Sequence, residues 1–124
     1  MDMRGLRGAT TVGEDQADQV IAATKELLEA MLAANPGMQT DCIASVVFTV
    51  TDDISSAFPA LAARQMGWGS VPMICAREIP VPGSLPLCIR VLLHWNTDVP
   101  QATVRHVYLR DAVKLRPDLA SQAQ

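Results

Sequence analysis

The stretch Leu87-Cys-Ile-Arg90-Val-Leu-Leu-His-Trp95 determines how the rest of the chain is interpreted. Its odd positions are all apolar, and its even positions carry cysteine, arginine, leucine and histidine. Such an alternation predicts a β-strand with one face in the core. Arg90 stands in the middle of the other face, and a guanidinium keeps its charge and is costly to bury without an anion. We therefore expect Arg90 to meet either Glu78 or a ligand that brings its own negative charge.

The sequence on either side of this strand predicts a mixed α and β domain. Apolar residues recur at helical spacing over 14–35, with Glu14, Asp15 and Asp18 at the positive end of the helix, and Asn35-Pro-Gly ends it. A short helix is expected to begin at Pro59 and to end before Gly67. Further strands are expected over 3–12, 41–51, 71–78 and 106–109, of which 41–51 is expected to be buried on both faces. Residues 112–116 are a candidate extension of the last of these strands. A proline-rich loop is expected over 79–86, and a turn or short helix over 100–105.

The order of these elements, βαβαββ, indicates a single α/β or α+β domain. We expect a mixed sheet with one long and one short helix on the same face, a domain that spans 1–119 and a polar tail over 120–124. The uncovered face is partly apolar, so we expect a partner subunit to cover it.

Arg4 and Arg7 are an odd number of positions apart on the first strand and should face opposite sides, one exposed and the other toward a site.

The net charge and the arginine content limit the kinds of ligand that the protein is expected to bind. The chain has 124 residues and a net charge of −3, which argues against a nucleic-acid surface. Eight of the ten basic residues are arginine, the side chain best suited to grip carboxylates with paired hydrogen bonds. This bias favours a small anionic ligand, although a genome that uses arginine freely explains it equally well.

The three cysteines at 42, 75 and 88 share no C-x-x-C spacing and indicate reduced thiols, so we expect a cytoplasmic protein. No apolar run reaches membrane-spanning length, and the first residues show no signal-peptide pattern, so we expect neither a membrane span nor a signal peptide. His94 and His106 lack cysteines at ligand spacing, so no metal site is predicted. Cys75 and Cys88 are interpreted as small buried residues rather than nucleophiles. From the residues alone, Glu78 and Arg90 form either a structural ion pair or one wall of an anion pocket.

Several motifs in order resemble one known family, the trimeric α/β class of chorismate mutase, over 3–119. The motifs are Arg4-Gly-Leu-Arg7-Gly-Ala-Thr-Thr, Phe58-Pro-Ala, Val71-Pro, Cys75 with Glu78, Cys88-Ile-Arg90-Val, Thr97-Asp-Val-Pro-Gln, Arg105-His-Val-Tyr108-Leu and Leu115-Arg-Pro-Asp-Leu119. The resemblance implies rearrangement of chorismate to prephenate in phenylalanine and tyrosine biosynthesis, with no cofactor. It also implies a homotrimeric pseudo-barrel with its sites between subunits.

The resemblance also assigns roles by position. It implies that Arg90 contacts the ether oxygen and a carboxylate, that Glu78 accepts a hydrogen bond from the ring hydroxyl, and that Arg7 and Tyr108 hold the side-chain carboxylate. It implies further substrate contacts from Cys75, Phe58, Arg64, Leu115 and Arg116. The family often has a lysine where this chain has Leu61, which is expected to weaken substrate capture more than chemistry.

Two other functions remain open on the sequence. One is a trimeric module that recognises a small carboxylate, for binding or for regulation, without catalysis. The other is a trimeric imine or enamine hydrolase of similar architecture that grips a carboxylate with arginine.

Overall fold

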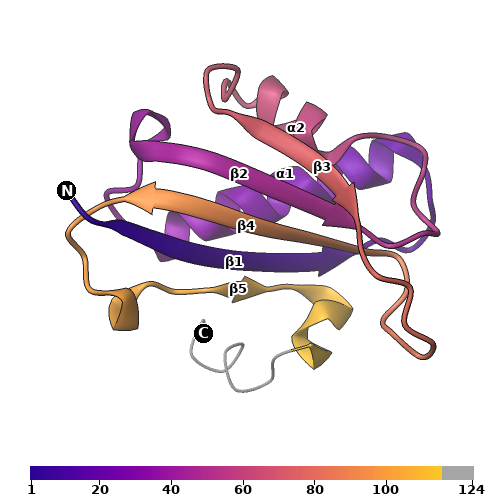
Figure 1. Cartoon of the computed structure of the whole chain (residues 1–124). Coiled ribbons are helices and arrows are strands. Elements are labelled where there is room, and N and C mark those ends of the chain that lie inside the picture. The colour runs from indigo at the N-terminus through magenta and orange to yellow at the C-terminus, as the bar shows by residue number, and fades with distance from the viewer. Residues whose placement is uncertain (116–124) are drawn as a thin grey trace.

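Figure 1 shows the sheet and its two α-helices. The structure is a computed structural model, and it describes residues 1–115. Within those residues the sheet has five strands, in the spatial order β3-β2-β4-β1-β5. The strands are β1 (Met3–Thr11), β2 (Ile43–Val50), β3 (Met73–Arg77), β4 (Cys88–Asn96) and β5 (Val107–Tyr108). The α-helices are α1 (Ala17–Ala34) and α2 (Pro59–Gln65), and the 3-10 helices are η1 (Thr40–Cys42), η2 (Gln101–Thr103) and η3 (Arg110–Lys114).

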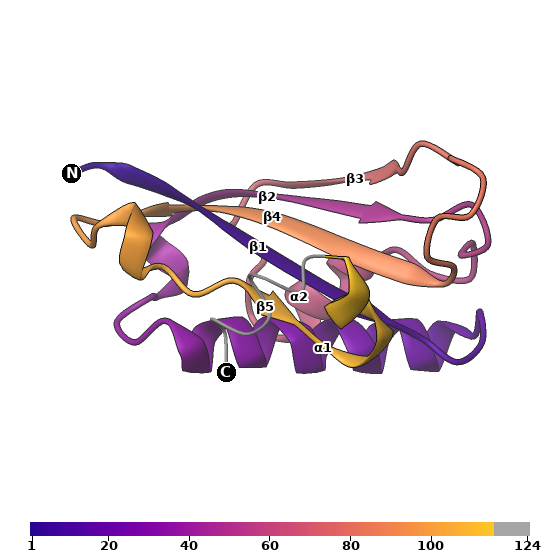
Figure 2. The ribbon, with the colours of Figure 1, turned by 90° about the horizontal axis from the view of Figure 1, so that it is seen from below.

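The sheet is mixed, as predicted. β4 pairs antiparallel with both β1 and β2, whereas β1 with β5 and β2 with β3 are parallel pairs. Both α-helices lie on one face, so the opposite face is open (Figure 2). The expected combination of one long and one short helix on a single face is therefore confirmed.

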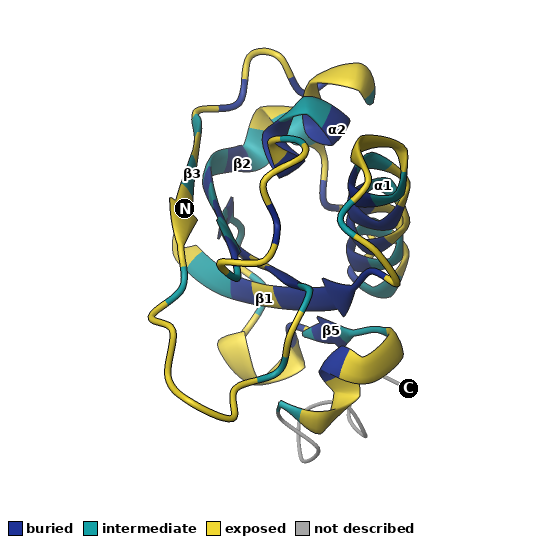
Figure 3. Ribbon diagram, turned by 90° about the vertical axis from the view of Figure 1, so that its right-hand side faces the viewer, coloured by how far each residue is buried: buried dark blue, intermediate teal, exposed yellow. Residues whose placement is uncertain are grey.

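The core lies between the sheet and α1. The alternation predicted for β4 places Ile89, Val91, Leu93 and Trp95 on the helix side, where all four are buried. Val91, Leu93 and Trp95 belong to one buried cluster with Leu27, Leu28 and Met31 of α1, and Ile89 belongs to a second cluster with Val20 and Ala23 of the same helix. In Figure 3, buried residues (dark blue) lie along α1, β1 and β2, whereas many of the connecting loops are exposed (yellow). The apolar faces of β4 and α1 thus meet in two buried clusters between the sheet and the helix.

Helix α1 begins later than the sequence predicts. It starts at Ala17, with Gln16 at the N-cap, and Asp18 is the acidic residue of its first turn. Asp15 is used differently: its carboxylate accepts hydrogen bonds from the backbone of Ser55 at 3.0 Å and of Ser56 at 3.1 Å. The carboxylate was expected to interact with the helix dipole, but it fixes the distant loop that leads into α2.

The C-terminal end of the described chain corrects a second expectation. Residues 112–116 were a candidate strand extension, yet Arg110–Lys114 form the 3-10 helix η3. Arg110 adopts a positive φ of 53°, which bends the chain out of an extended path immediately after β5. Ala112 is then fully buried, so the turn is anchored by its own apolar residue.

β2 is an interior strand between β3 and β4, but it is not buried on both faces as expected: in the single chain only its helix-facing side is fully buried. Val46 and Phe48 are in the core, whereas Val47 and Thr49 on the open face are partly exposed. The open face also exposes Ile74 of β3 by 63% and Leu92 of β4 by 41%. These apolar side chains leave an incompletely covered surface on the face that carries Arg90.

Candidate active site

The open face of the sheet holds a cavity of about 430 Å³ beside Arg90. Five of the residues singled out from the sequence line it, and the strands β1, β2, β4 and β5 all contribute to its wall. The lining residues are Arg7, Gly8, Ala9, Val47, Thr49, Glu78, Arg90, Val91, Leu92, Tyr108 and Leu115.

Strand register explains why residues distant in sequence meet in this cavity. Arg90 is paired with Ala9 of β1 on one side and with Thr49 of β2 on the other, and Ala9 is paired with Tyr108 of β5. Directly paired residues project from the same face of a sheet, so these four side chains form one row across the open face. Ala9 is the smallest of them, and it lines the cavity although it is only 1% exposed.

A second row lies next to the first and is mainly apolar. Arg7 is paired with Leu92, Leu92 with Val47, and Val47 with Ile74. The cation of Arg7 therefore stands at one end of an apolar row, on the same face as Arg90. The two arginines of the cavity are separated along their strands by a single step of this face, a spacing that suits a ligand with two anionic groups.

Glu78 closes one side of the cavity and is held there by three contacts. Its backbone N–H donates to the carbonyl of Val50 at 3.0 Å, and its carboxylate accepts a hydrogen bond from Thr49 Oγ1. Arg90 Nε lies 3.7 Å from Glu78 Oε2. At that distance the contact is an ion pair rather than a hydrogen bond. Glu78 therefore orients Arg90 without covering it, and 44% of the arginine side chain stays exposed.

Cys88 lies next to Arg90 in sequence, but it is a core residue. Burial raises the pKa of the Cys88 thiol, and the neighbouring Arg90 charge opposes that shift only in part. The side chain is buried, so the thiol stays protonated and inaccessible. The interpretation of Cys88 as a small buried residue agrees with this environment.

The remaining predicted site residues lie elsewhere on the chain. Phe58 and Cys75 line a different cavity, of about 400 Å³, between the loop before α2 and β3, together with Arg77. Phe58 is 69% exposed there. Arg64 is exposed on α2 and lines neither cavity. Arg116 lies outside the described residues.

Sequence reasoning missed several residues around the first cavity. Thr49 lies in a stretch whose sequence predicts a strand buried on both faces, yet its hydroxyl donates a hydrogen bond to the carboxylate of Glu78. Leu92 and Val47 were not singled out, because apolar residues in strands carry no signal that separates a site wall from a core position. Arg4 was expected to be exposed or to face a site; instead its Nε donates to the carbonyl of Val99 at 2.7 Å.

Among residues 1–115, no group of three or more histidine, cysteine or acidic side chains is arranged to hold a metal ion. Within the same part of the chain, no helix is long and apolar enough to cross a bilayer.

Comparison with known proteins adds independent information. The family model described as "Chorismate mutase type I" matches residues 3–119. A curated relative from Thermus thermophilus, "Chorismate mutase AroH", is 60% identical over 119 residues, which is 96% of this chain and 98% of the relative. The protein of the same name from Bacillus subtilis is 44% identical over 121 residues, covering 97% of this chain and 94% of its own. A solved chorismate mutase from Clostridium thermocellum superposes with a TM-score of 0.85 at 51% identity, covering 87% of this chain and 96% of its own.

Proposed function

The chain belongs to the type I chorismate mutases, isomerases that convert chorismate to prephenate, and we propose that its reaction takes place in the cavity between Arg7, Glu78 and Arg90. The observation that carries this proposal is the position of Arg90, an ion-paired but half-exposed guanidinium that lines the cavity. The chain's role in the biosynthesis of phenylalanine and tyrosine follows from the family.

The reaction needs positioning and charge rather than a chemical group from the protein. One C–O bond breaks and one C–C bond forms, and the electron pairs move within the substrate, so no proton or leaving group passes to the protein. The substrate carries two carboxylates and must adopt a compact, chair-like conformer before it reacts. Two arginines on one face can select that conformer by holding both carboxylates, which removes much of the entropic part of the barrier.

Arg90 is proposed to act on the breaking bond. The ether oxygen gains negative charge as its bond to the ring lengthens, and a fixed guanidinium beside it stabilises that charge more strongly in the transition state than in the bound substrate. Glu78 is proposed to accept a hydrogen bond from the ring hydroxyl, and it also fixes the direction of the guanidinium. Arg7 and Tyr108 are proposed to hold the side-chain carboxylate, and Leu115 to wall the cavity.

We further propose a homotrimer with its sites between subunits. Phe58 and Cys75 line a cavity bounded by β3, an edge strand, whereas Arg7 and Tyr108 lie toward the opposite edge, at β1 and β5. On one chain these groups cannot surround the same ligand, but a neighbouring copy can bring its Phe58, Arg64 and Cys75 to the first cavity. The exposed Ile74 and Leu92 support burial of the open face by other copies. Arg116 is proposed as a further contact from the C-terminal segment.

A cytoplasmic location is part of the proposal. All three cysteines are free thiols rather than disulfides, which suits a reducing compartment.

The test of the function is direct. Purified protein is mixed with chorismate, and its ultraviolet absorbance is followed while the product is identified as prephenate. Loss of the diene absorbance with formation of prephenate supports the proposal. Binding without turnover would favour a carboxylate-binding module, and a product other than prephenate would exclude the proposed reaction.

A further inference from the structure

One edge of β1 is completed mostly by side chains rather than by another strand. β1 has nine residues, and β4 pairs with all of them along one edge, but β5 offers only two residues to the other edge. Backbone groups at a strand edge need partners, from protein or water, wherever no strand supplies them. Alternate residues of a strand direct their backbone groups to the same edge. The partners of residues 5, 7, 9 and 11 therefore decide how firmly this edge of β1 is held.

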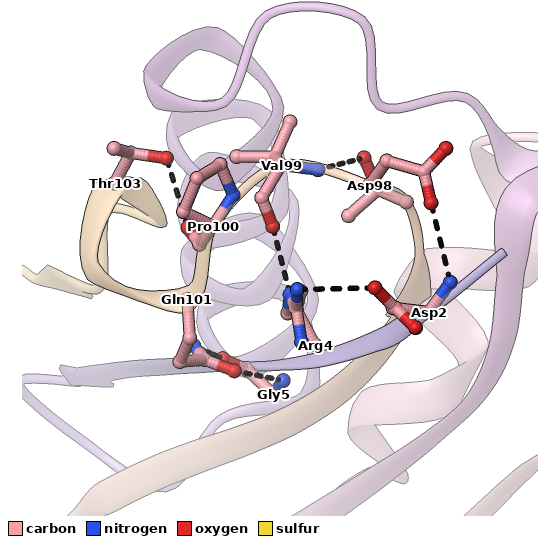
Figure 4. Close-up of polar contacts among 9 residues, drawn as sticks. Asp2, Arg4, Gly5, Asp98, Val99, Pro100, Gln101 and Thr103 are labelled. Carbon is pink, nitrogen blue, oxygen red and sulfur yellow. Dashed lines mark hydrogen bonds and ion pairs between the residues drawn. The ribbon is translucent and has the colours of Figure 1, made fainter.

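The segment 101–110 supplies these partners in register. Gln101 acts like a strand residue toward Gly5: its Oε1 accepts from the Gly5 N–H at 3.0 Å, and its Nε2 donates to the Gly5 carbonyl at 2.8 Å (Figure 4). Two residues further along β1, the backbone N–H of Arg7 donates to Nδ1 of His106 at 2.9 Å. Two later contacts continue the series: Leu109 N–H to the carbonyl of Ala9 at 2.9 Å, and Arg110 Nη1 to the carbonyl of Thr11 at 3.4 Å.

The contact at Arg7 fixes the chemical state of His106. A backbone N–H is always the donor, so Nδ1 must offer its lone pair, and the ring proton must be on Nε2. A distance of 2.9 Å is typical of a normal N–H hydrogen bond. The imidazole of His106 therefore stands where a backbone carbonyl would stand if β5 were longer.

Arg105, the residue before His106, is itself held in place by the side chain of Asn35. The side chain of Asn35, at the end of α1, accepts from the N–H of Arg105 at 2.9 Å and donates to the carbonyl of Arg105 at 2.9 Å. Asn35 is 3% exposed, and its amide also donates to the carbonyl of Met31 at 2.9 Å. The path from α1 to Arg105 thus runs through buried or partly buried hydrogen bonds. Its last link, from the Arg7 N–H to the imidazole of His106, is an exposed hydrogen bond.

We propose that His106 is a positioning residue that sets the place of Arg7 in the cavity through the Arg7 backbone. The guanidinium of Arg7 lines the cavity beside Arg90, and its direction depends on the main chain from which it projects. The inference depends on the proposed function, because the expected kinetic effect assumes that Arg7 holds a carboxylate of chorismate. That grip is made both in the bound substrate and in the transition state, so its loss raises KM more than it lowers kcat.

Three replacements of His106 separate the hydrogen bond from general packing. His106→Leu removes the acceptor. His106→Asn puts an amide oxygen near the place of Nδ1, and His106→Gln moves that oxygen one methylene further out. We expect KM for chorismate to rise about 3- to 10-fold in His106→Leu, the range for one hydrogen bond, with kcat changed by less than about two-fold. His106→Asn should recover most of the KM, and His106→Gln should not.

Gln101→Leu provides the matched control. It removes the same kind of side-chain partner from the same edge of β1, at Gly5, which has no side chain in the cavity. We expect it to lower the melting temperature while leaving KM within about two-fold of wild type. If His106→Leu fails to fold, the comparison of His106→Asn with His106→Gln decides, because both are polar and differ by one methylene.

Hydrogen exchange at the Arg7 amide, followed by NMR, gives a readout that does not depend on turnover. The amide should be protected in wild type and His106→Asn, and should exchange faster in His106→Leu. If chorismate is not converted by wild type, the proposed function is wrong, while the exchange data still decide the role of His106. Unchanged Arg7 exchange in His106→Leu would overturn the inference, as would KM rising equally in Gln101→Leu and His106→Leu.

Discussion

Arg90 and Glu78 face each other at 3.7 Å across the edge of a cavity, and neither side chain is enclosed by the other. The side chains stay 44% and 27% exposed, respectively. An ion pair with this exposure is screened by water and contributes little to folding. The pair is therefore better understood as an arrangement that aims a cation into the cavity than as an element of stability. This distinction makes the role of Arg90 testable separately from the fold.

Thr10 offers a test of the core. Its side chain is fully buried on the helix side of β1, and no hydrogen-bond partner for its Oγ1 exists among the described residues. Leaving a buried hydroxyl without a partner costs about 1–3 kcal/mol, and valine has nearly the same shape. We expect Thr10→Val to raise the free energy of unfolding by about 1 kcal/mol in urea denaturation. A loss of stability would mean that the hydroxyl has a partner in solution.

Gly8 allows β1 to pack closely against α1. A Cβ at this position would lie 2.5 Å from Sδ of Met31 and 3.3 Å from Cδ1 of Leu27. Because Met31 is fully buried, the overlap cannot be relieved into solvent. We expect Gly8→Ala to destabilise the protein by about 1–3 kcal/mol, the usual range for overpacking.

A double-mutant cycle checks that explanation. Met31→Ala alone should destabilise by about 2–5 kcal/mol, since it leaves a cavity. Combined with Gly8→Ala, the total loss should be smaller than the sum of the two, because the new methyl occupies space that Met31 has vacated. Strictly additive losses would show that the two sites do not share this space.

Asp15 gives a prediction for pH dependence. Hydrogen bonds from Ser56 and Ser55 lower the pKa of the Asp15 carboxyl below its ordinary value of 3.8. A group whose pKa is lower in the folded state stabilises the fold above its unfolded pKa, and this contribution is lost as pH falls through the folded pKa. We therefore expect Asp15→Asn to melt below wild type at pH 7, and the difference in melting temperature to shrink on acidification below about pH 4. A difference that stayed constant down to pH 3 would contradict this assignment.

Sharing of sites between subunits can be tested by mixing two inactive variants. One carries Arg90→Gln, and the other carries Phe58→Ala with Arg64→Gln. If each site takes its two walls from neighbouring copies, unfolding and refolding an equal mixture should restore activity at about a quarter of the sites, because random assembly gives that share an intact pair of walls. Sedimentation should also give a mass three times the 13.3 kDa of one chain. A monomer, or a mixture as inactive as its parts, would exclude the shared site.

The parts of the fold that could be predicted are those that depend on the local spacing of apolar residues and on proline and glycine at the ends of elements. The alternation around Arg90 predicted β4 and its buried face, and the helical spacing of apolar residues predicted α1. Pro59 and Gly67 bounded α2, and Gly67 does adopt a positive φ of 92°. The meeting of Arg90 with Glu78 could be expected because a charge in mid-strand demands a counter-charge, and few acids lie within reach in the second half of the chain.

What could not be predicted depends on contacts between distant residues. Asp15 with Ser55, Asn35 with Arg105, and His106 with Arg7 all join a side chain to the backbone of a remote segment. Such contacts leave no repeating pattern in the sequence, since each depends on strand order and on where a helix ends. For the same reason, Asn35 was recognised only as a helix stop before proline, although its side chain also anchors the segment that leads into β5.

The most direct test of the central claim is the turnover number of Arg90→Gln with chorismate. Removal of one preorganised donor to a developing oxyanion lowers kcat by about 10²-fold or more, and we expect at least that loss here. The melting temperature should stay close to that of wild type, since the Arg90–Glu78 pair is half-exposed. A folded Arg90→Gln variant with the kcat of wild type would contradict the proposed role of this guanidinium.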